Sequence, residues 1–203
     1  KANTLFGTNG DDTIDGRGGA DVLHGGAGND TYYVPNSLAT VVEKAGEGVD
    51  TVVAKGNHIL GDNVENLTIS DAGINGWSGT GNELNNQIVG NAGPNTLDGK
   101  AGADTIFGGL GNDVIIGGKG DDLLIGGPGN DIFRFVPGDG RDVIRDFSVG
   151  DQIDIYAYVK AGITVTVQDA GADVVLNFSN GDAITLIGVE PSLLKSVYYG
   201  FVG

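Results

Sequence analysis

Apolar residues recur every nine positions in two stretches of the chain, residues 7–33 and 81–134. In a unit such as "GGKGDDLLI" (residues 117–125), glycines come first, an Asp stands at position six and the apolar residue at position eight. The residues at position eight are Ile14, Leu23, Tyr32, Ile88, Leu97, Ile106, Ile115, Leu124 and Phe133. The last three residues of a unit predict a short strand with position eight pointing inward. The glycine-rich remainder predicts a tight turn, because glycine adopts positive φ at little cost.

Nine such units in register indicate a repeat architecture. Two units would make one rung, so successive turns on one edge should lie two units apart in the sequence. We therefore expect an all-β protein, a parallel β-roll (right-handed β-solenoid) with an antiparallel β cap at its C-terminus. The expected parts are a first block over 1–33, irregular solenoid rungs over 34–80, a second block over 81–135 and a cap over 136–203. A separate linker domain over 34–80 is the alternative.

The segments after residue 134 alternate apolar and polar residues instead of following the nine-residue period. "DQIDIYAYV", "GITVTVQDA", "DVVLNF" and "DAITLIGV" predict antiparallel strands, with "SNGD" as a hairpin turn. "PSLLKS" predicts one short helical turn, and "SVYYGFVG" a last strand. This cap would close the end of the solenoid, as terminal repeats must.

Charge narrows the choice of partner. The formal net charge of −16 argues against nucleic acid and anionic membranes as partners and favours a cation. The chain has no Cys, no apolar run long enough to insert in a membrane and no N-terminal signal peptide. Because it begins at Lys1, we expect it to be part of a longer or processed protein.

The rungs are too thin to fold by apolar burial alone. Each strand buries about one large side chain, which is weak against the entropy of ordering a unit rich in glycine. Stacked rungs would also hold carboxylates ~5 Å apart, where like charges repel. Calcium, which takes six to eight oxygen ligands, would reverse this repulsion, and its binding would become folding free energy. Magnesium resists an all-protein cage, and zinc lacks its preferred ligands here.

Units such as "GGAGNDTYY" and "GGKGDDLLI" resemble the GGxGxDxUx signature of RTX (repeats-in-toxin) proteins, which form a calcium-binding parallel β-roll. The tail "DIFRFVPGDGRDVIRDFSVGDQIDI" resembles the end of the β-roll in serralysin-type exoproteins. The resemblance implies a secreted, extracellular protein with an uncleaved C-terminal signal for the type I secretion machinery.

The resemblance also implies the calcium ligands. They are the carbonyls of positions two and four with the Asp of one turn, and the carbonyls of positions one and three with the Asp of the turn two units on. Three expected sites follow. They are Thr8, Gly10 and Asp12 with Gly25, Ala27 and Asp30; Lys100, Gly102 and Asp104 with Gly117, Lys119 and Asp122; and Gly109, Gly111 and Asp113 with Gly126, Pro128 and Asp131.

Asn replaces the expected Asp in two units and removes a charge. A site of Asn91, Gly93 and Asn95 with Gly108, Leu110 and Asp113 is therefore expected to be weak, and one joining Asn86 to Asp104 weaker still. Asp21 has no matching turn two units later. Asp50 could complete a site with Asp30, and Asp142 one with Asp122, or these acids could be solvated turn residues.

Other chemistries have less support. Paired carboxylates could indicate a glycosidase, but every Asp of the units stands at a repeat position. The Gly-x-Gly pattern lacks the "GK[ST]" of a phosphate loop. Trp77 and the Tyr32–Tyr33 pair could stack on a sugar, although such residues more often close a core, and His24 is expected to be exposed and inert. We expect a non-catalytic calcium-binding module, with a calcium-dependent polysaccharide-binding module as the alternative.

Overall fold

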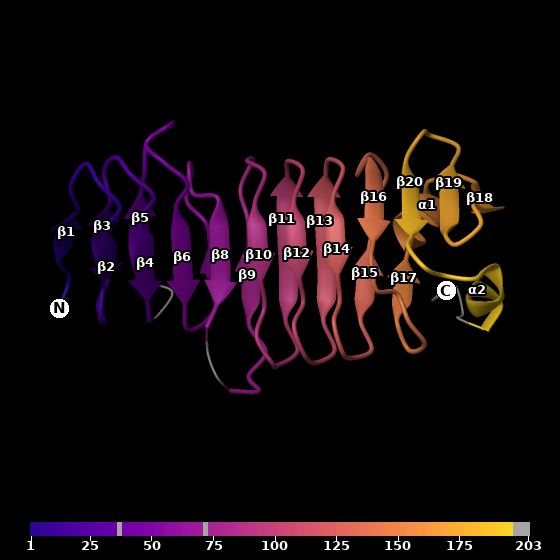
Figure 1. Ribbon diagram of the computed structural model, residues 1–203, viewed down its shortest axis with the longest axis horizontal. Coiled ribbons are helices and arrows are strands. Elements are labelled where there is room, and N and C mark those ends of the chain that lie inside the picture. Colours follow the sequence, from indigo (N-terminus) through magenta and orange to yellow (C-terminus); the bar gives the residue numbers. More distant parts are fainter. Residues whose placement is uncertain (36–37, 71–72, 197–203) are drawn as a thin grey trace.

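The computed structural model describes residues 1–35, 38–70 and 73–196, and its strands stack along one long axis (Figure 1). The described residues form three sheets. The first has the order β1 (Thr4–Phe6), β3 (Val22–His24), β5 (Thr40–Val42). The second has the order β18 (Val165–Asp169), β19 (Val174–Phe178), β20 (Ala183–Leu186), β16 (Arg141–Ile144), β14 (Leu123–Ile125), β12 (Thr105–Phe107), β10 (Gln87–Val89), β8 (Asn66–Ile69), β6 (Thr51–Ala54), β4 (Thr31–Val34), β2 (Thr13–Asp15). The third has the order β17 (Gln152–Asp154), β15 (Ile132–Arg134), β13 (Val114–Lys119), β11 (Thr96–Ala101), β9 (Ser78–Thr80), β7 (His58–Ile59).

The regular rungs have the predicted spacing. Gln87 of β10 pairs with Thr105 of β12, and Thr96 of β11 with Val114 of β13, each two units on and parallel. The position-eight side chains point inward, and from Ile88 to Phe133 each is fully buried. The parallel β-solenoid is confirmed.

The described strands between residues 38 and 80 include β6 to β9, which lie in the same sheets as the regular rungs. β6 pairs with β4 and with β8, both in parallel, while β7 pairs with β9. The register runs from Thr31 to Thr51, then to Asn66 and then to Gln87, and these three steps are unequal in length. The described strands of this segment are therefore hydrogen-bonded to those of the regular blocks on both sides.

The parallel rungs continue past residue 135, where the cap was expected to begin. β16 pairs in parallel with β14, and β17 with β15, at a spacing slightly longer than two units. The segment "DQIDIYAYV", predicted as an antiparallel strand, is instead the parallel strand β17 followed by the helix α1 (Tyr156–Lys160). The alternating pattern misled because Tyr158 turns inward from a helix rather than from a strand.

An antiparallel cap closes the solenoid. β18 pairs with β19, β19 with β20, and β20 joins the solenoid by pairing in parallel with β16 (Figure 1). The helix α2 (Pro191–Ser196) follows, as "PSLLKS" predicted. The expected last strand in "SVYYGFVG" lies almost wholly outside the described residues. No helix in the described part of the chain is both long and apolar enough to cross a bilayer.

Candidate metal centres

The position-six acids form a ladder of hydrogen bonds between rungs. The backbone N–H of Asp104 donates to Oδ1 of Asp122 at 2.8 Å, and that of Asp113 donates to Oδ1 of Asp131 at 2.9 Å. The same bond joins Asp12 to Asp30 at 2.7 Å. One oxygen of each accepting carboxylate is therefore fixed by the backbone of the preceding turn.

The second oxygen of these carboxylates is buried without a hydrogen-bond partner. Among the described residues this holds for Oδ2 of Asp21, Asp30, Asp104, Asp113, Asp122 and Asp131, and for Oε2 of Glu43. The six aspartates are at most 2% exposed. Leaving a buried charged oxygen unpaired is costly, so a row of such oxygens is suited to a cationic partner.

In the aspartate-bearing turns of the second block, the first glycine borders the unpaired oxygen. A methyl group on Gly108 would lie 2.5 Å from both Asp113 Oδ2 and the carbonyl oxygen of Gly126. On Gly99 it would overlap Asp104 Oδ2 and the carbonyl oxygen of Gly117. Any side chain here would fill the space between a carboxylate and a carbonyl of the next rung. We call this space the glycine cradle.

The remaining predicted carbonyls stack beneath glycines of the following rung. Those of Thr8, Gly10, Lys100, Gly102, Gly109, Gly111, Asn91 and Gly93 would each be overlapped or closely contacted by a Cβ on the glycine above. Among the position-three carbonyls, that of Lys119 accepts the N–H of Gly102 at 2.9 Å and that of Pro128 the N–H of Gly111 at 3.1 Å. Each such oxygen keeps one lone pair for another partner.

Burial makes the charged form of these acids costly. It raises the pKa of Asp104 to about 7, those of Asp113 and Asp122 to about 6, and that of Asp142 to about 8. Hydrogen bonds from the backbone oppose these shifts, and neighbouring carboxylates add to them. At neutral pH, without a cation, part of the row would hold protons.

Asn86 and Asn95 satisfy their polar atoms without an ion. Asn86 Nδ2 donates to the carbonyls of Val64 and Glu65, both at 3.1 Å, while its Oδ1 accepts the N–H of Asn82 at 2.7 Å. Asn95 Oδ1 accepts the N–H of Asn91 at 2.8 Å. The side-chain oxygens of Asn86 and Asn95 therefore have hydrogen-bond donors within the protein, whereas Oδ2 of the six aspartates above has none.

The other predicted acids differ in their surroundings. Asp12 Oδ2 accepts both the N–H and the hydroxyl of Thr8, at 2.6 and 2.8 Å. Asp21, the acid without a matching turn, accepts the N–H of Asn3 at 2.8 Å, and its Oδ2 is unpaired. The structure brings Asp50 next to Asp30 and Asp142 next to Asp122, with N–H to Oδ1 distances of 2.8 and 3.0 Å.

These residues fit calcium. Each cradle between two aspartate-bearing rungs presents a carboxylate oxygen and a carbonyl oxygen, which are ligands that calcium takes, and the aspartates of the two rungs would balance the charge of one ion. A bound divalent ion would neutralise two charges and tie two rungs together.

Sequence reasoning missed three acids that continue the rows. Asp151 Oδ1 accepts the N–H of Asp131 at 2.9 Å, although its place in the sequence departs from the two-unit spacing. Glu43 and Asp146 stand where the next rung would have its first glycine, since they accept the N–H of Gly25 at 3.2 Å and of Gly126 at 2.9 Å. The signal for Asp151 was the Gly-Asp-x-Ile motif at residues 150–153. For Glu43 and Asp146 no repeat pattern applies.

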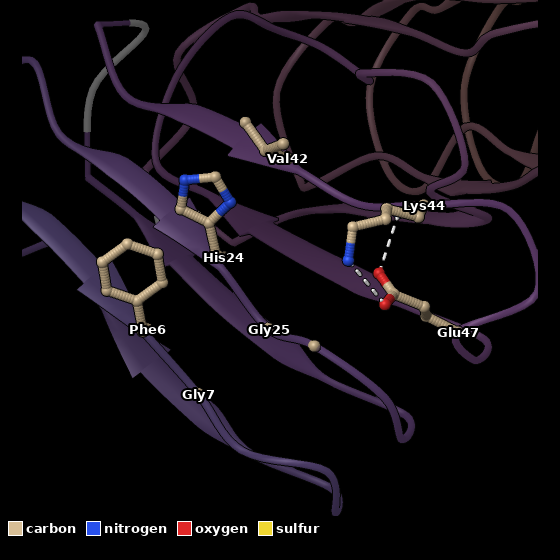
Figure 2. Close-up of a pocket in the computed structure, with 8 residues that line it drawn as sticks. Phe6, Gly7, His24, Gly25, Val42, Lys44 and Glu47 are labelled. Atoms are coloured by element: carbon tan, nitrogen blue, oxygen red, sulfur yellow. Dashed lines mark hydrogen bonds and ion pairs between the residues drawn. The ribbon is translucent and has the colours of Figure 1, made fainter.

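A shallow groove of about 310 Å³ lies on the first sheet (Figure 2). The rings of Phe6 and His24 stack with centroids 4.9 Å apart, and Phe6 is 75% exposed. The Lys44–Glu47 ion pair, at 2.9 Å, borders the same groove. His24, expected to be exposed and inert, is half-buried and stacked on Phe6.

Comparison with known families matches the regular rungs. The model of the RTX calcium-binding nonapeptide repeat matches four times, over residues 1–32, 80–115, 98–133 and 108–144. Two curated relatives are endo-1,3-1,4-beta-glycanases of Rhizobium meliloti (strain 1021). EglC is 35% identical over 95% of this chain, and ExsH is 41% identical over 44% of it. The chain spans only 38% and 19% of the lengths of these two relatives.

Two solved structures resemble the fold. The extracellular lipase LipA from Serratia marcescens has a TM-score of 0.48 and 19% identity, covering 93% of this chain and 38% of that one. The AlgE6R3 subunit of the Azotobacter vinelandii mannuronan C5-epimerase has a TM-score of 0.37 and 27% identity, covering 64% and 82%.

Proposed function

This chain belongs to the proteins that carry RTX calcium-binding nonapeptide repeats, and from that premise we propose that it is a non-catalytic module that folds when calcium binds. The observation that carries this proposal is the row of unpaired Oδ2 atoms at Asp104, Asp113, Asp122 and Asp131, each fully buried in a glycine turn. Without an ion, the stacked carboxylates repel and oppose folding. With calcium, the same carboxylates become ligands, so ion binding supplies folding free energy.

The ligands expected from the repeat pattern remain part of this proposal. Ions would lie between the turns of Asp12 and Asp30, of Asp104 and Asp122, and of Asp113 and Asp131. The contact of the Gly117 and Gly126 carbonyls with the cradles below supports the last two. At the Asn95 turn the amide hydrogen bonds compete with an ion, which supports a weaker site there.

A calcium-dependent fold suits export. A chain held unfolded at low calcium could pass through a type I secretion channel and fold outside, where calcium is abundant. We infer that the module is extracellular and serves the protein of which it forms part, as an accessory to an extracellular hydrolase, lyase or protease. The glycanase names of the two curated relatives support a carbohydrate-active parent. The role of the extreme C-terminus as an export signal concerns residues outside the described range.

Circular dichroism of calcium-stripped protein tests the folding switch. Adding calcium chloride should produce β-sheet signal in a cooperative transition, and magnesium chloride at the same concentration should not. Asp113→Asn should shift the calcium midpoint upward by about tenfold, because it removes a carboxylate from the middle of the row. A β-sheet spectrum that is the same in stripped buffer and in calcium would refute the proposal.

The groove of Figure 2 favours polysaccharide binding as a second function. Stacked Phe6 and His24 beside a charged pair present an aromatic face with polar edges, which suits a sugar ring. Retardation in gels containing mixed-linkage β-glucan, with calcium present, tests it. Phe6→Ala should abolish the retardation, whereas Tyr156→Ala, which removes an exposed aromatic at the cap, should not. Equal migration with and without glucan would reject this function.

A further inference from the structure

Three buried carboxylates meet where the first regular block joins the irregular rungs. Asp30, Glu43 and Asp50 each present one oxygen such that all three lie within 4.8 Å of one another. The three side chains are 1%, 6% and 1% exposed. Glu43 and Asp50 lie outside the residues that match the RTX repeat. The sequence paired Asp50 with Asp30, but no repeat position assigns Glu43 to this cluster.

Glu43 takes the place that the first glycine has in a regular turn. Leu23 of β3 pairs with Val41 of β5, so Glu43 follows in register with Gly25. In regular rungs a side chain here would overlap the carboxylate of its own turn. In this rung more residues separate Glu43 from Asp50 than separate the first glycine from the acid of a regular unit, so the turn is longer.

The carboxylate of Glu43 is held in one orientation. Its Oε1 accepts the N–H of Gly25 at 3.2 Å and the hydroxyl of Tyr32, whose side chain is fully buried. Its Oε2 has no hydrogen-bond partner. Two protein donors therefore fix one oxygen and leave the other free for a ligand.

Asp30 supplies a second unpaired oxygen. Its Oδ1 accepts the N–H of Asp12 at 2.7 Å, while its Oδ2 is buried and unpartnered. Asp50 Oδ1 in turn accepts the N–H of Asp30 at 2.8 Å. Asp30 Oδ2 and Glu43 Oε2 are thus two buried, unsatisfied acceptors in one cluster, which is the arrangement a cation stabilises.

From this geometry we propose that Asp30, Glu43 and Asp50 bind a hard divalent cation, calcium, in a three-carboxylate site that lies outside the repeat pattern. Its formal charge of −3 exceeds the −2 of a cradle between two aspartates, so the site binds calcium more tightly than the cradles do. The pairing of β2 with β4 keeps the two-unit spacing, whereas that of β4 with β6 is longer. The ion would fasten the first block to the irregular rungs at this change of register.

Replacing Glu43 with its neutral isostere Gln distinguishes two roles for this side chain, that of a calcium ligand and that of a buried acid which simply holds a proton. Burial, with Asp50 and Asp30 adding to it, raises the pKa of Glu43 to about 7, so Glu43 could instead simply hold a proton. Glu43→Gln keeps the shape and an acceptor for Gly25 and Tyr32 but removes the charge. Glu83→Gln, which changes an exposed acid in a regular turn, is the matched control.

Calcium titration by calorimetry, with ion counting on dialysed protein, measures the effect. We expect Glu43→Gln to bind one calcium fewer than wild type, or to bind its tightest calcium at least about tenfold more weakly, while Glu83→Gln matches wild type. A Glu43→Gln protein with the wild-type count and affinities would overturn the three-carboxylate site and leave the proposed folding switch intact. Wild-type protein that binds no calcium would overturn both.

A second measurement does not depend on how Glu43→Gln folds. Terbium(III) chloride should fill the site of highest negative charge first, and its emission is sensitised by a tyrosine ring beside it. Tyr32→Phe keeps the buried ring, so the first terbium equivalent should lose more than half of its tyrosine-sensitised emission. Undiminished emission from the first equivalent in this variant would place the tightest site elsewhere and overturn the inference.

Discussion

The irregular rungs over residues 34–80 and the regular rungs over 81–135 share their sheets but differ in what holds them together. β6 and β8 each bury two side chains, Val52 with Ala54 and Leu67 with Ile69. β10 and β12 each bury only one, Ile88 or Ile106. The further buried side chain of Ile69 in β8 contributes ~1.5–3 kcal/mol, and that of Ala54 in β6 contributes less. The irregular rungs thus have a wider apolar interior.

Unpaired carboxylate oxygens are more numerous in the regular rungs than in the irregular ones. Four of the unpaired oxygens lie in the regular rungs, at Asp104, Asp113, Asp122 and Asp131. Within the described part of 34–80 one such oxygen occurs, at Glu43. The comparison teaches that one solenoid combines two kinds of cohesion. The regular rungs carry a continuous row of acids suited to cations, whereas the irregular rungs rely more on apolar burial and have their proposed cation site only where they join the first block.

Hydrogen exchange should separate the two regions most clearly. On removal of calcium we expect the amides of β10 to β15 to lose protection by about a hundredfold or more, because the carboxylate repulsion there is no longer opposed. The amides of β6 and β8 should lose much less, apart from those next to the proposed site of Asp30, Glu43 and Asp50. Mass spectrometry of peptides from both regions, in calcium and in stripped buffer, measures this.

Magnesium in place of calcium is the control for ionic strength, and it should leave the regular rungs unprotected. Equal loss in both regions would mean that the solenoid opens as one cooperative unit. In that case the difference in core width would have no thermodynamic consequence.

The repeat pattern predicted the regular rungs well because one rule fixes each residue there. Position eight points inward and position six carries the acid. Periodicity alone therefore predicted that Asp104 and Asp122 lie on one edge of the solenoid and Asp113 on the opposite edge. The unpaired Oδ2 atoms could not be read from sequence, since they depend on which oxygen the preceding backbone takes.

The register of the irregular rungs could not be predicted, because no single period describes it. Their register steps differ from one rung to the next, because loop length and apolar packing set them rather than a period. Glu43 could not be found because its role depends on standing opposite Gly25, which only the pairing of β3 with β5 reveals. Likewise, the helix α1 has an alternating pattern that is typical of a strand.

Acid should partly replace calcium in the regular rungs. Burial raises the pKa of Asp104 to about 7 and that of Asp142 to about 8, above the ordinary value of 3.8, so the folded state binds protons more readily than the unfolded state. The contribution of these protonated carboxyl groups to the free energy of unfolding is fully present below about pH 4. It is lost as the pH rises through 6 to 8, where the groups ionise in the folded state. In calcium-stripped buffer the β-sheet signal should therefore increase as pH falls from 8 to 5, and the melting temperature should rise with it.

Thermal melts followed by circular dichroism give this dependence, and saturating calcium is the comparison. With the ion bound the carboxylates stay charged, so the rise on acidification should vanish or reverse. A stripped protein whose melting temperature falls steadily from pH 8 to pH 5 would contradict the account of the regular rungs as a row of repelling acids.

A pair of glycine substitutions gives the smallest expected effect and the most local test. Gly108→Ala places a methyl group 2.5 Å from Asp113 Oδ2 and from the Gly126 carbonyl, inside the glycine cradle. Gly56→Ala, in the irregular rungs, meets only Trp77 at 3.9 Å, an ordinary contact. Neither glycine has a positive φ, so the two variants compare available space rather than backbone strain.

We expect Gly108→Ala to cost ~1–3 kcal/mol of unfolding free energy in saturating calcium and Gly56→Ala less than ~0.5 kcal/mol. Denaturant unfolding in calcium measures both, and the cost of Gly108→Ala should shrink in stripped buffer at pH 5, where no ion competes for the cradle. A cost that is the same with and without calcium would mean that the methyl group disturbs the packing of the turns alone, and that the cradle of Gly108 does not hold an ion.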